Sequence, residues 1–227
     1  MNKKFNYEKY YSDYWEGEYS KRIETRYFEK IYDRFKKKLT PKNNLKIIDV
    51  GGGNGHFSYY LNLKEPTIFD ISDSGLEFAR TKFNYKTIKG DVHNMHSIKE
   101  GSFDVAFCME IAEHLDFPNL LFTNVHRVLG EGGVLFVSVP NEKIDGIQHK
   151  KRWKFKELIE DLRKSGFRLE WSNNNPRFYH KHIGKKSLGY LFANTMFYIF
   201  PEKFKFYLSR KFPDYFSAMF IVKAIKI

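Results

Sequence analysis

Cysteine, long apolar runs and internal repeats are almost absent from this sequence, and each absence narrows the class of protein. The single cysteine, Cys108, excludes an internal disulfide, and its apolar neighbours predict a buried strand. No stretch is long and apolar enough to span a bilayer. Residues 1–8 also lack the apolar centre of a signal peptide. A cytoplasmic protein is therefore expected.

Acidic residues are in the minority, with 27 against 39 lysines and arginines, so the 227-residue chain has a net charge of +12. Basic residues gather at Lys36–Lys38, at Lys150–Arg152 and between Lys181 and Lys186. They could form a solvated surface, or bind an anionic acceptor, a nucleic acid or an anionic membrane. The sequence has no zinc-finger, RNP or helix-turn-helix signature, so nucleic acid is the least expected partner. Peripheral membrane contact stays open, and the sequence carries no signal for an oligomeric state.

A glycine-rich turn is the most informative feature that is present. Ile47–Val50 read as the end of a buried strand, and four of the next five residues, 51–55, are glycines. His56–Leu61 can then begin a helix, whose first N–H groups face the turn. Strand, glycine turn and helix together predict a nucleotide site at the carboxyl edge of an open α/β sheet.

The spacing of these glycines argues against a dinucleotide. The dinucleotide fingerprint G-x-G-x-x-G would start at Gly51 and Gly53, but its third position falls on His56. The sequence instead reads D-x-G-x-G-x-G from Asp49 to Gly55. This pattern resembles the first motif of the class I S-adenosylmethionine-dependent methyltransferases.

Acids follow the next two predicted strands. Asp70 lies near the end of the segment Pro66–Ser72, which reads as a second short strand, and is close to the roughly 20-residue offset at which such folds place an acid on the ribose hydroxyls. Ser72 is expected to cap the following helix. A third strand ends at Gly90-Asp91-Val92, which resembles the turn that contacts adenine in this family.

The second half of the core continues the alternation of strands and helices. We expect a strand at 103–108, an amphipathic helix at 120–129 stopped by Gly130–Gly133, and a strand at 134–139. A helix and the strand Phe167–Trp171 follow, and residues 216–227 suit an antiparallel last strand. Residues 45–171 resemble ubiquinone-biosynthesis O-methyltransferases and the broad type 11 methyltransferases.

The resemblance implies the fold class, the cofactor and the residues that bind it. The fold is α/β: a Rossmann-like, doubly wound, mostly parallel sheet of seven strands with the last strand antiparallel. The cofactor is S-adenosyl-L-methionine. The residues implied to bind it are Asp49, Gly51, Gly53, Gly55, Asp70, Ile71, Asp91, Val92, Met109 and Glu110.

Two segments lie outside that core. Residues 1–40 are expected to form a helical lid ahead of a methyltransferase domain at 41–227. The resemblance implies that Tyr11, Tyr14 and Arg22 cover the methionine end of the cofactor, and packing in the core is the alternative for these residues. Residues 175–213 are expected to be a helical insertion, rich in aromatic residues such as Phe197 and Tyr198 and interleaved with lysines. This insertion could be a cap over the acceptor, a dimer surface or a membrane contact.

Three residues are candidates for catalysis. An oxygen acceptor must lose its proton when it takes a methyl group, and histidine suits a base that works near neutral pH. Glu113 and His114 follow the fourth strand, and His149 follows the fifth. Glu110, Glu113 and His114 could also hold a divalent cation, but the sequence lacks a clear remaining set of ligands, so no metal is predicted.

We therefore expect an enzyme that methylates oxygen on a small-molecule, carbohydrate or lipid-linked acceptor. N- or C-methylation of a quinone-like or other small molecule is the alternative within enzymes. A noncatalytic protein that keeps the cofactor fold is the alternative from another class, although the intact Asp49, Asp70 and Asp91 argue against it.

Overall fold

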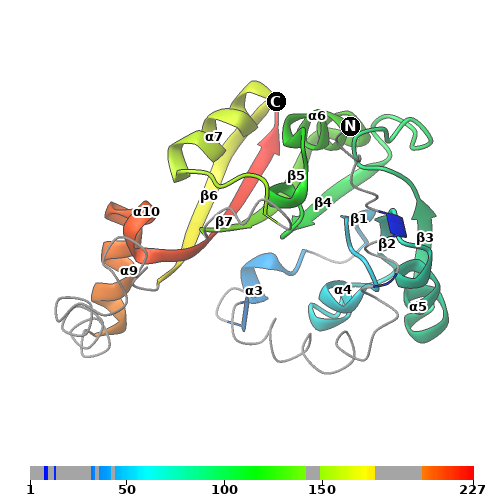
Figure 1. Cartoon of the computed structure of the whole chain (residues 1–227), viewed down its shortest axis with the longest axis horizontal. Helices are drawn as coiled ribbons and strands as arrows, with labels where there is room; N and C mark the ends of the chain where they lie inside the picture. The colour runs from blue at the N-terminus through cyan, green and yellow to red at the C-terminus, as the bar shows by residue number, and fades with distance from the viewer. Residues whose placement is uncertain are drawn as a thin grey trace, which may run out of the picture.

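The computed structural model describes residues 8–9, 13, 32–33, 36–41, 44–141, 149–176 and 201–227. Within these residues, seven strands form one sheet (Figure 1). The strands are β1 (Ile47–Val50), β2 (Thr67–Asp70), β3 (Lys86–Lys89), β4 (Phe103–Met109), β5 (Leu129–Pro140), β6 (Phe167–Pro176) and β7 (Ser217–Lys226).

The strand order is β3-β2-β1-β4-β5-β7-β6. Strands β1 to β5 pair in parallel, whereas β7 runs antiparallel to both β5 and β6. The predicted doubly wound sheet with an antiparallel last strand is therefore confirmed. The order reverses between β1 and β4, and open α/β sheets bind their ligands outside the carboxyl ends of the strands at such a point.

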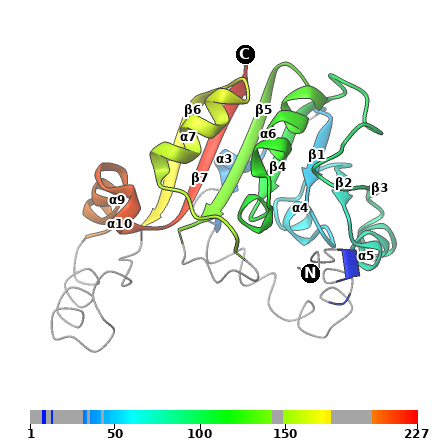
Figure 2. The same cartoon turned by 45° about the horizontal axis from the view of Figure 1, so that its top comes forward.

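Helices cover both faces of this sheet. Figure 1 shows α6 and α7 on one face and α3, α4 and α5 on the other, and Figure 2 shows α7 and α6 lying along the strands. The helices are α3 (Lys36–Leu39), α4 (His56–Tyr60), α5 (Asp73–Phe83), the 3-10 turn η2 (Ala112–His114), α6 (Pro118–Val128), α7 (Phe155–Lys164), α9 (Glu202–Lys211) and α10 (Pro213–Phe216).

Side chains of the central strand β4 point alternately to the two faces of the sheet, and each face has its own hydrophobic core. Ala106 and Cys108 are buried among side chains of α6 and α7, and Cys108 occupies the buried strand position predicted for it. Phe107 faces the other way and packs against Phe57 of α4, with ring centroids 5.6 Å apart. A strand buried on both faces needs a continuous apolar run, which explains the sequence of β4 from Val105 to Met109.

Two predicted boundaries are wrong. Residues 130–133 do not form a loop after the helix, because α6 ends at Val128 and β5 begins at once with Leu129, which pairs with Phe103. Strand β6 continues to Pro176 by pairing with β7, five residues beyond the predicted end of that strand at Trp171. In both places pairing with a neighbouring strand outweighs the local preference of glycine, asparagine and proline for loops.

Candidate functional site

The glycine turn connects β1 to α4 at the centre of the carboxyl edge. Gly51, Gly53 and Gly55 all have positive φ angles, between 52° and 77°. At Gly51 a side chain would also meet a neighbour, since an added Cβ would lie 1.9 Å from Cδ1 of Ile111 in the turn after β4. The turn after β4 therefore packs directly on the glycine turn, which only a residue without a side chain permits.

Asp49 lies beneath this turn and is almost fully buried. Its Oδ2 accepts a hydrogen bond of 2.6 Å from the Ser58 hydroxyl of α4. Burial raises the pKa of Asp49 to about 7, the Ser58 hydrogen bond opposes that rise, and the nearby charge of Asp70 adds to it. The Asp49 side chain thus faces α4 and supports the glycine turn from below.

Stability should depend on pH through Asp49. The pKa of Asp49 in the folded chain lies above the usual value of 3.8. Its stabilising contribution to the free energy of unfolding is therefore fully present below the unfolded pKa and is lost as pH rises through about 7. The whole shift corresponds to about 4 kcal/mol. In urea titrations at pH 5 and pH 7.5, Asp49→Asn should therefore gain stability relative to the original chain as pH rises. Parallel profiles for the two proteins would contradict this assignment.

Asp70, at the end of β2, ties the glycine turn to the start of α5. Its Oδ2 accepts from the Gly53 N–H at 2.9 Å, and its Oδ1 accepts from the Ser72 N–H at 2.8 Å. Burial raises the pKa of Asp70, and the backbone hydrogen bonds oppose that rise. Each carboxylate oxygen can accept two hydrogen bonds, so these contacts leave capacity for a ligand hydroxyl. Ile71 beside it is half-buried, and Ser72 caps α5 as predicted by accepting from the Gly75 N–H.

The turn after β3 lies at the same edge, because the Gly90 N–H donates to the Asp70 carbonyl at 2.9 Å. The exposed Asp91 accepts from both the backbone N–H and the ring Nδ1 of His93, at 2.9 and 2.7 Å. Val92 is buried, and its carbonyl accepts from the Asn124 side chain of α6. The ends of β1, β2 and β3 thus bring together the acids and glycines that a nucleoside-containing cofactor would need.

Glu110, directly after Met109 at the end of β4, is held from two sides. It has a φ of 54°, which is unusual for a residue with a side chain. Its N–H donates to the carbonyl and the hydroxyl of Ser138 in β5, at 3.0 and 3.2 Å. The Tyr32 hydroxyl donates to Glu110 Oε1 at 2.6 Å. Sequence reasoning missed Tyr32 and Ser138, although a serine inside the apolar run of β5 was a visible signal.

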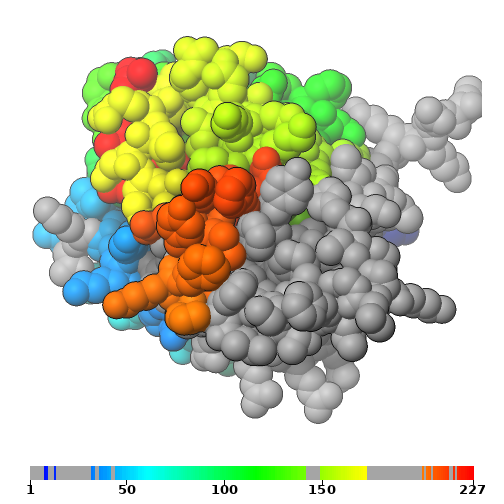
Figure 3. Space-filling view, turned by 90° about the vertical axis from the view of Figure 1, so that its left-hand side faces the viewer, coloured from blue at the N-terminus to red at the C-terminus, as the bar shows by residue number. Residues whose placement is uncertain are grey.

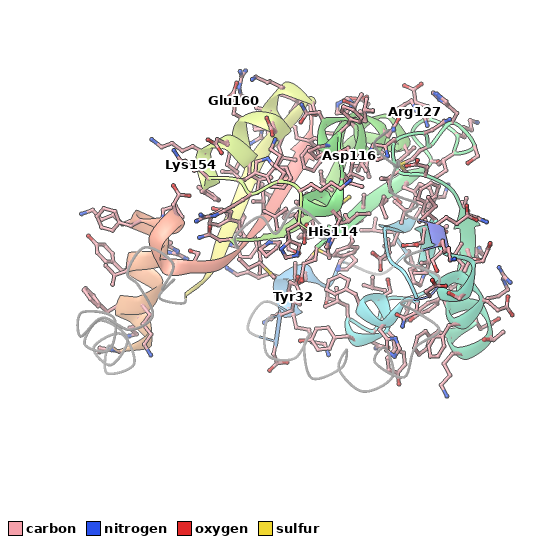
Figure 4. All side chains as sticks on the ribbon, viewed as in Figure 1. Tyr32, His114, Asp116, Arg127, Lys154 and Glu160 are labelled. Carbon is pink, nitrogen blue, oxygen red and sulfur yellow. The ribbon has the colours of Figure 1, made fainter. Side chains whose placement is uncertain are left out.

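The three predicted catalytic residues, Glu113, His114 and His149, lie together. The Glu113 carbonyl accepts from the N–H groups of Lys150 and Lys151, at 2.7 and 3.2 Å, which brings the loop after β5 to the turn after β4. His114 and His149 have ring centroids 5.1 Å apart, and His114 Nε2 lies 3.7 Å from Glu113 Oε1. Figure 4 shows His114 near the ends of β4 and β5.

These three side chains could hold a metal ion. Each offers one ligand atom, and the three atoms lie within 4.8 Å of one another. The sequence suggested Glu110, Glu113 and His114 as possible metal ligands. In the described part of the chain, His149 and not Glu110 lies beside Glu113 and His114. The same arrangement suits proton transfer, because a buried carboxylate beside two imidazoles can orient a base.

Several predictions concern residues outside those that the structure describes: the lid residues Tyr11, Tyr14 and Arg22, the insertion residues Phe197 and Tyr198, and the basic segment 181–186. The basic group Lys150–Arg152 is described, and its members contact groups within the chain. Lys150 pairs with Asp116, Lys151 with Asp161, and Arg152 donates to Asn141. The two ion pairs reduce the net charge that this group presents to an anionic partner. Among the described helices, none is long and apolar enough to cross a membrane.

Comparison with known proteins agrees with this geometry. Residues 48–137 match the family model described as "Methyltransferase domain". This part of the chain is similar to a methyltransferase domain. The predicted resemblance to class I methyltransferases is confirmed, and the match supports the predicted enzyme class and S-adenosylmethionine as the cofactor.

Individual relatives of this domain are distant. The ubiquinone biosynthesis O-methyltransferase of Actinobacillus pleuropneumoniae is 30% identical over 110 residues, which are 44% of this chain and 47% of that protein. The chain thus spans less than half the length of the curated relatives that it matches. A solved S-adenosylmethionine-dependent methyltransferase from Thermotoga maritima has a TM-score of 0.66 at 19% identity, covering 96% of this chain and 99% of its own. A chain from the complex of the Haloferax volcanii Trm112 methyltransferase activator has a TM-score of 0.67 at 14% identity, covering 95% and 97%. At these low identities, the two structures support the fold of the domain and not its activity.

Proposed function

We propose that this chain transfers a methyl group from S-adenosylmethionine to an oxygen of a small-molecule, carbohydrate or lipid-linked acceptor. The observation that carries the proposal is the meeting of Glu113, His114 and His149 at the sheet edge that also holds the glycine turn. The bound cofactor supplies an electrophilic methyl group, and the protein's part is to align the acceptor and remove its proton.

The residues divide into two groups in this proposal. The ends of β1, β2 and β3 hold the cofactor, with Asp70 accepting from the ribose hydroxyls and Asp91 from the adenine amine. On the acceptor side, one imidazole of His114 or His149 accepts the acceptor proton. The buried Glu113 carboxyl lies 3.7 Å from His114 Nε2, where it can orient the imidazole ring.

A labelled-methyl assay tests the reaction. The protein is incubated with S-adenosylmethionine carrying an isotopic methyl group and with a panel of phenols, sugars and polyprenyl-linked sugars. We expect S-adenosylhomocysteine to be released together with a methyl ether on one class of hydroxyl. Label on nitrogen or carbon of an acceptor would favour the alternative enzyme classes. If the protein binds the cofactor but releases no S-adenosylhomocysteine when it is incubated with cell extracts, a noncatalytic protein is favoured.

A chelator separates the two uses of the histidine cluster. If Glu113, His114 and His149 act only in proton transfer, treatment with a chelator and readdition of Mg²⁺, Mn²⁺ or Zn²⁺ leaves turnover unchanged. Loss of turnover that one ion restores would assign the cluster to metal binding.

The described part of the insertion supports contact with an acceptor or an anionic surface. Helix α9 exposes Phe204 and Tyr207 by 42 and 51%, and Phe212, directly after the helix, is 45% exposed; Lys203 and Lys211 are exposed beside them. Figure 3 shows α9 (orange) on the outer face of the molecule. Exposed aromatic rings interleaved with lysines are typical of segments that bind at an anionic interface, and they equally suit a cap over an acceptor.

Replacing Phe204 and Tyr207 with serine should change acceptor or membrane binding and leave cofactor affinity unchanged. In co-sedimentation with phosphatidylglycerol vesicles, a membrane contact predicts salt-sensitive binding that this double variant loses. A cap predicts no vesicle binding and a higher KM for the acceptor, and a dimer surface predicts an altered oligomeric state. Leu120→Ser is the control, because Leu120 is 45% exposed on α6, outside the insertion. Weaker cofactor binding by the folded double variant would contradict the proposal that the insertion contacts the acceptor or a membrane and not the cofactor.

A further inference from the structure

Tyr32 joins elements that are far apart in the sequence. It lies 15 residues before β1 and is fully buried. Its hydroxyl lies 2.6 Å from Glu110 Oε1, 2.7 Å from Ser138 Oγ and 3.3 Å from Met219 Sδ. Its ring packs edge-on against Phe57 of α4 at a centroid distance of 5.3 Å. Figure 4 shows Tyr32 below the ends of the central strands, on the side of the sheet where α3 lies.

The protons of this group can be assigned. A phenol has one proton, and Tyr32 gives it to the Glu110 carboxylate. The Ser138 hydroxyl must then donate to the Tyr32 oxygen, and it can accept from the Glu110 N–H. The Met219 sulfur is a packing contact in this arrangement. Tyr32, Ser138 and Glu110 therefore form a closed ring of three hydrogen bonds, with an ionised carboxylate as one acceptor.

The ring holds Glu110 in a backbone conformation that it would otherwise avoid. A φ of 54° is disfavoured for a residue with a side chain, so surrounding contacts must maintain it. That conformation sets the path of the chain into Ile111. The Ile111 side chain fills the space beside Gly51, so its position bears directly on the glycine turn.

We propose that Tyr32 is a positioning residue for the cofactor site, acting through Glu110. The hydrogen bond from Tyr32 fixes Glu110, Glu110 places Ile111, and Ile111 packs against the glycine turn at Gly51. The chain segment before β1 is thereby coupled to the cofactor turn. The part of this inference that concerns the cofactor rests on the proposed function, whereas the ring itself does not.

Tyr32→Phe tests the ring, with Tyr60→Phe as the matched control. Both tyrosines are buried on the same side of the sheet, but the Tyr60 hydroxyl contacts Asp33 at 3.3 Å and does not reach Glu110. Calorimetric titration with S-adenosylhomocysteine should give about tenfold to a hundredfold weaker binding for Tyr32→Phe, the scale for losing a hydrogen bond to a charged group. Tyr60→Phe should bind as the original chain does.

A double-variant cycle shows whether Tyr32 acts through Glu110. In a Glu110→Gln background, Tyr32→Phe should weaken binding by less than about threefold, because the charged acceptor is already lost. Equal effects of Tyr32→Phe in both backgrounds would overturn the positioning role. Equal affinity for the Tyr32→Phe variant and the original chain would also overturn it.

Hydrogen exchange separates this inference from the proposed function. In the ligand-free protein, the Glu110 amide should exchange at least about threefold faster in Tyr32→Phe than in Tyr60→Phe, because its N–H keeps the bond to the Ser138 carbonyl while the Ser138 hydroxyl is no longer held by Tyr32. If the original chain does not bind S-adenosylhomocysteine, the proposed function fails, and the exchange rates still decide whether the ring exists. Unchanged exchange at Glu110 would overturn the ring.

Discussion

Replacing His114 or His149 with alanine should lower turnover with a hydroxyl acceptor by about a hundredfold or more, the usual scale for losing a general base. Cofactor affinity should stay similar, because neither histidine is among the residues implied to bind the cofactor, which follow β1, β2 and β3 or, as Met109 and Glu110, lie at the end of β4. The measurement is steady-state release of S-adenosylhomocysteine beside calorimetric cofactor titration.

The two histidines should not contribute independently. Their rings are 5.1 Å apart, so the double variant should lose little more activity than the worse single variant. His96→Ala is the control, because His96 is exposed in the loop after β3. Near-normal turnover in both single variants would show that alignment alone drives the reaction and would remove the histidines from the mechanism.

Replacing Gly51 with alanine should abolish most cofactor binding. The new Cβ would lie 1.9 Å from Ile111 Cδ1, and the backbone there has a φ of 72°. Left-handed strain and displacement of Ile111 together are expected to cost about 2–5 kcal/mol in stability or binding. Thermal unfolding and titration with S-adenosylhomocysteine measure the two effects.

Two further variants separate strain from collision at Gly51. Gly132→Ala introduces the same kind of strain at a φ of 69°, but an added Cβ there meets nothing within 4 Å. It should therefore cost less than Gly51→Ala. Adding Ile111→Ala to Gly51→Ala should recover part of the lost binding. If Gly51→Ala and Gly132→Ala behave alike, contact with Ile111 does not restrict the glycine turn.

Much of the sheet was predictable because its strands are short apolar runs that end in distinctive residues. Ile47–Val50 is buried and apolar except for Asp49, and Val105–Cys108 is buried and apolar at every position. The carboxyl ends of parallel strands must share one edge, which is why Asp70 and Asp91 could be assigned to one site before the structure was known. Ser72 was predictable as a cap because the preference for serine at that position is local.

Contacts between segments far apart in the chain were not predictable. Pairing with Phe103 draws Leu129 directly into β5, although the glycines that follow favour a loop. The Glu113 carbonyl brings His149 beside His114 through backbone groups that carry no sequence signal. Tyr32 has an ordinary place among the aromatic residues before β1, and its distances to Glu110 and Ser138 distinguish it only in three dimensions.

Calorimetric titration of the original chain with S-adenosylmethionine, S-adenosylhomocysteine and NAD, beside Asp70→Ala, tests the central claim most directly. We predict that both adenosyl compounds bind and that NAD binds much more weakly, because His56 stands where a third glycine would be needed. Asp70→Ala should weaken binding by about 1.5–3 kcal/mol, the range for a hydrogen bond to a charged group. Tighter binding of NAD, or unchanged affinity in folded Asp70→Ala, would contradict the account.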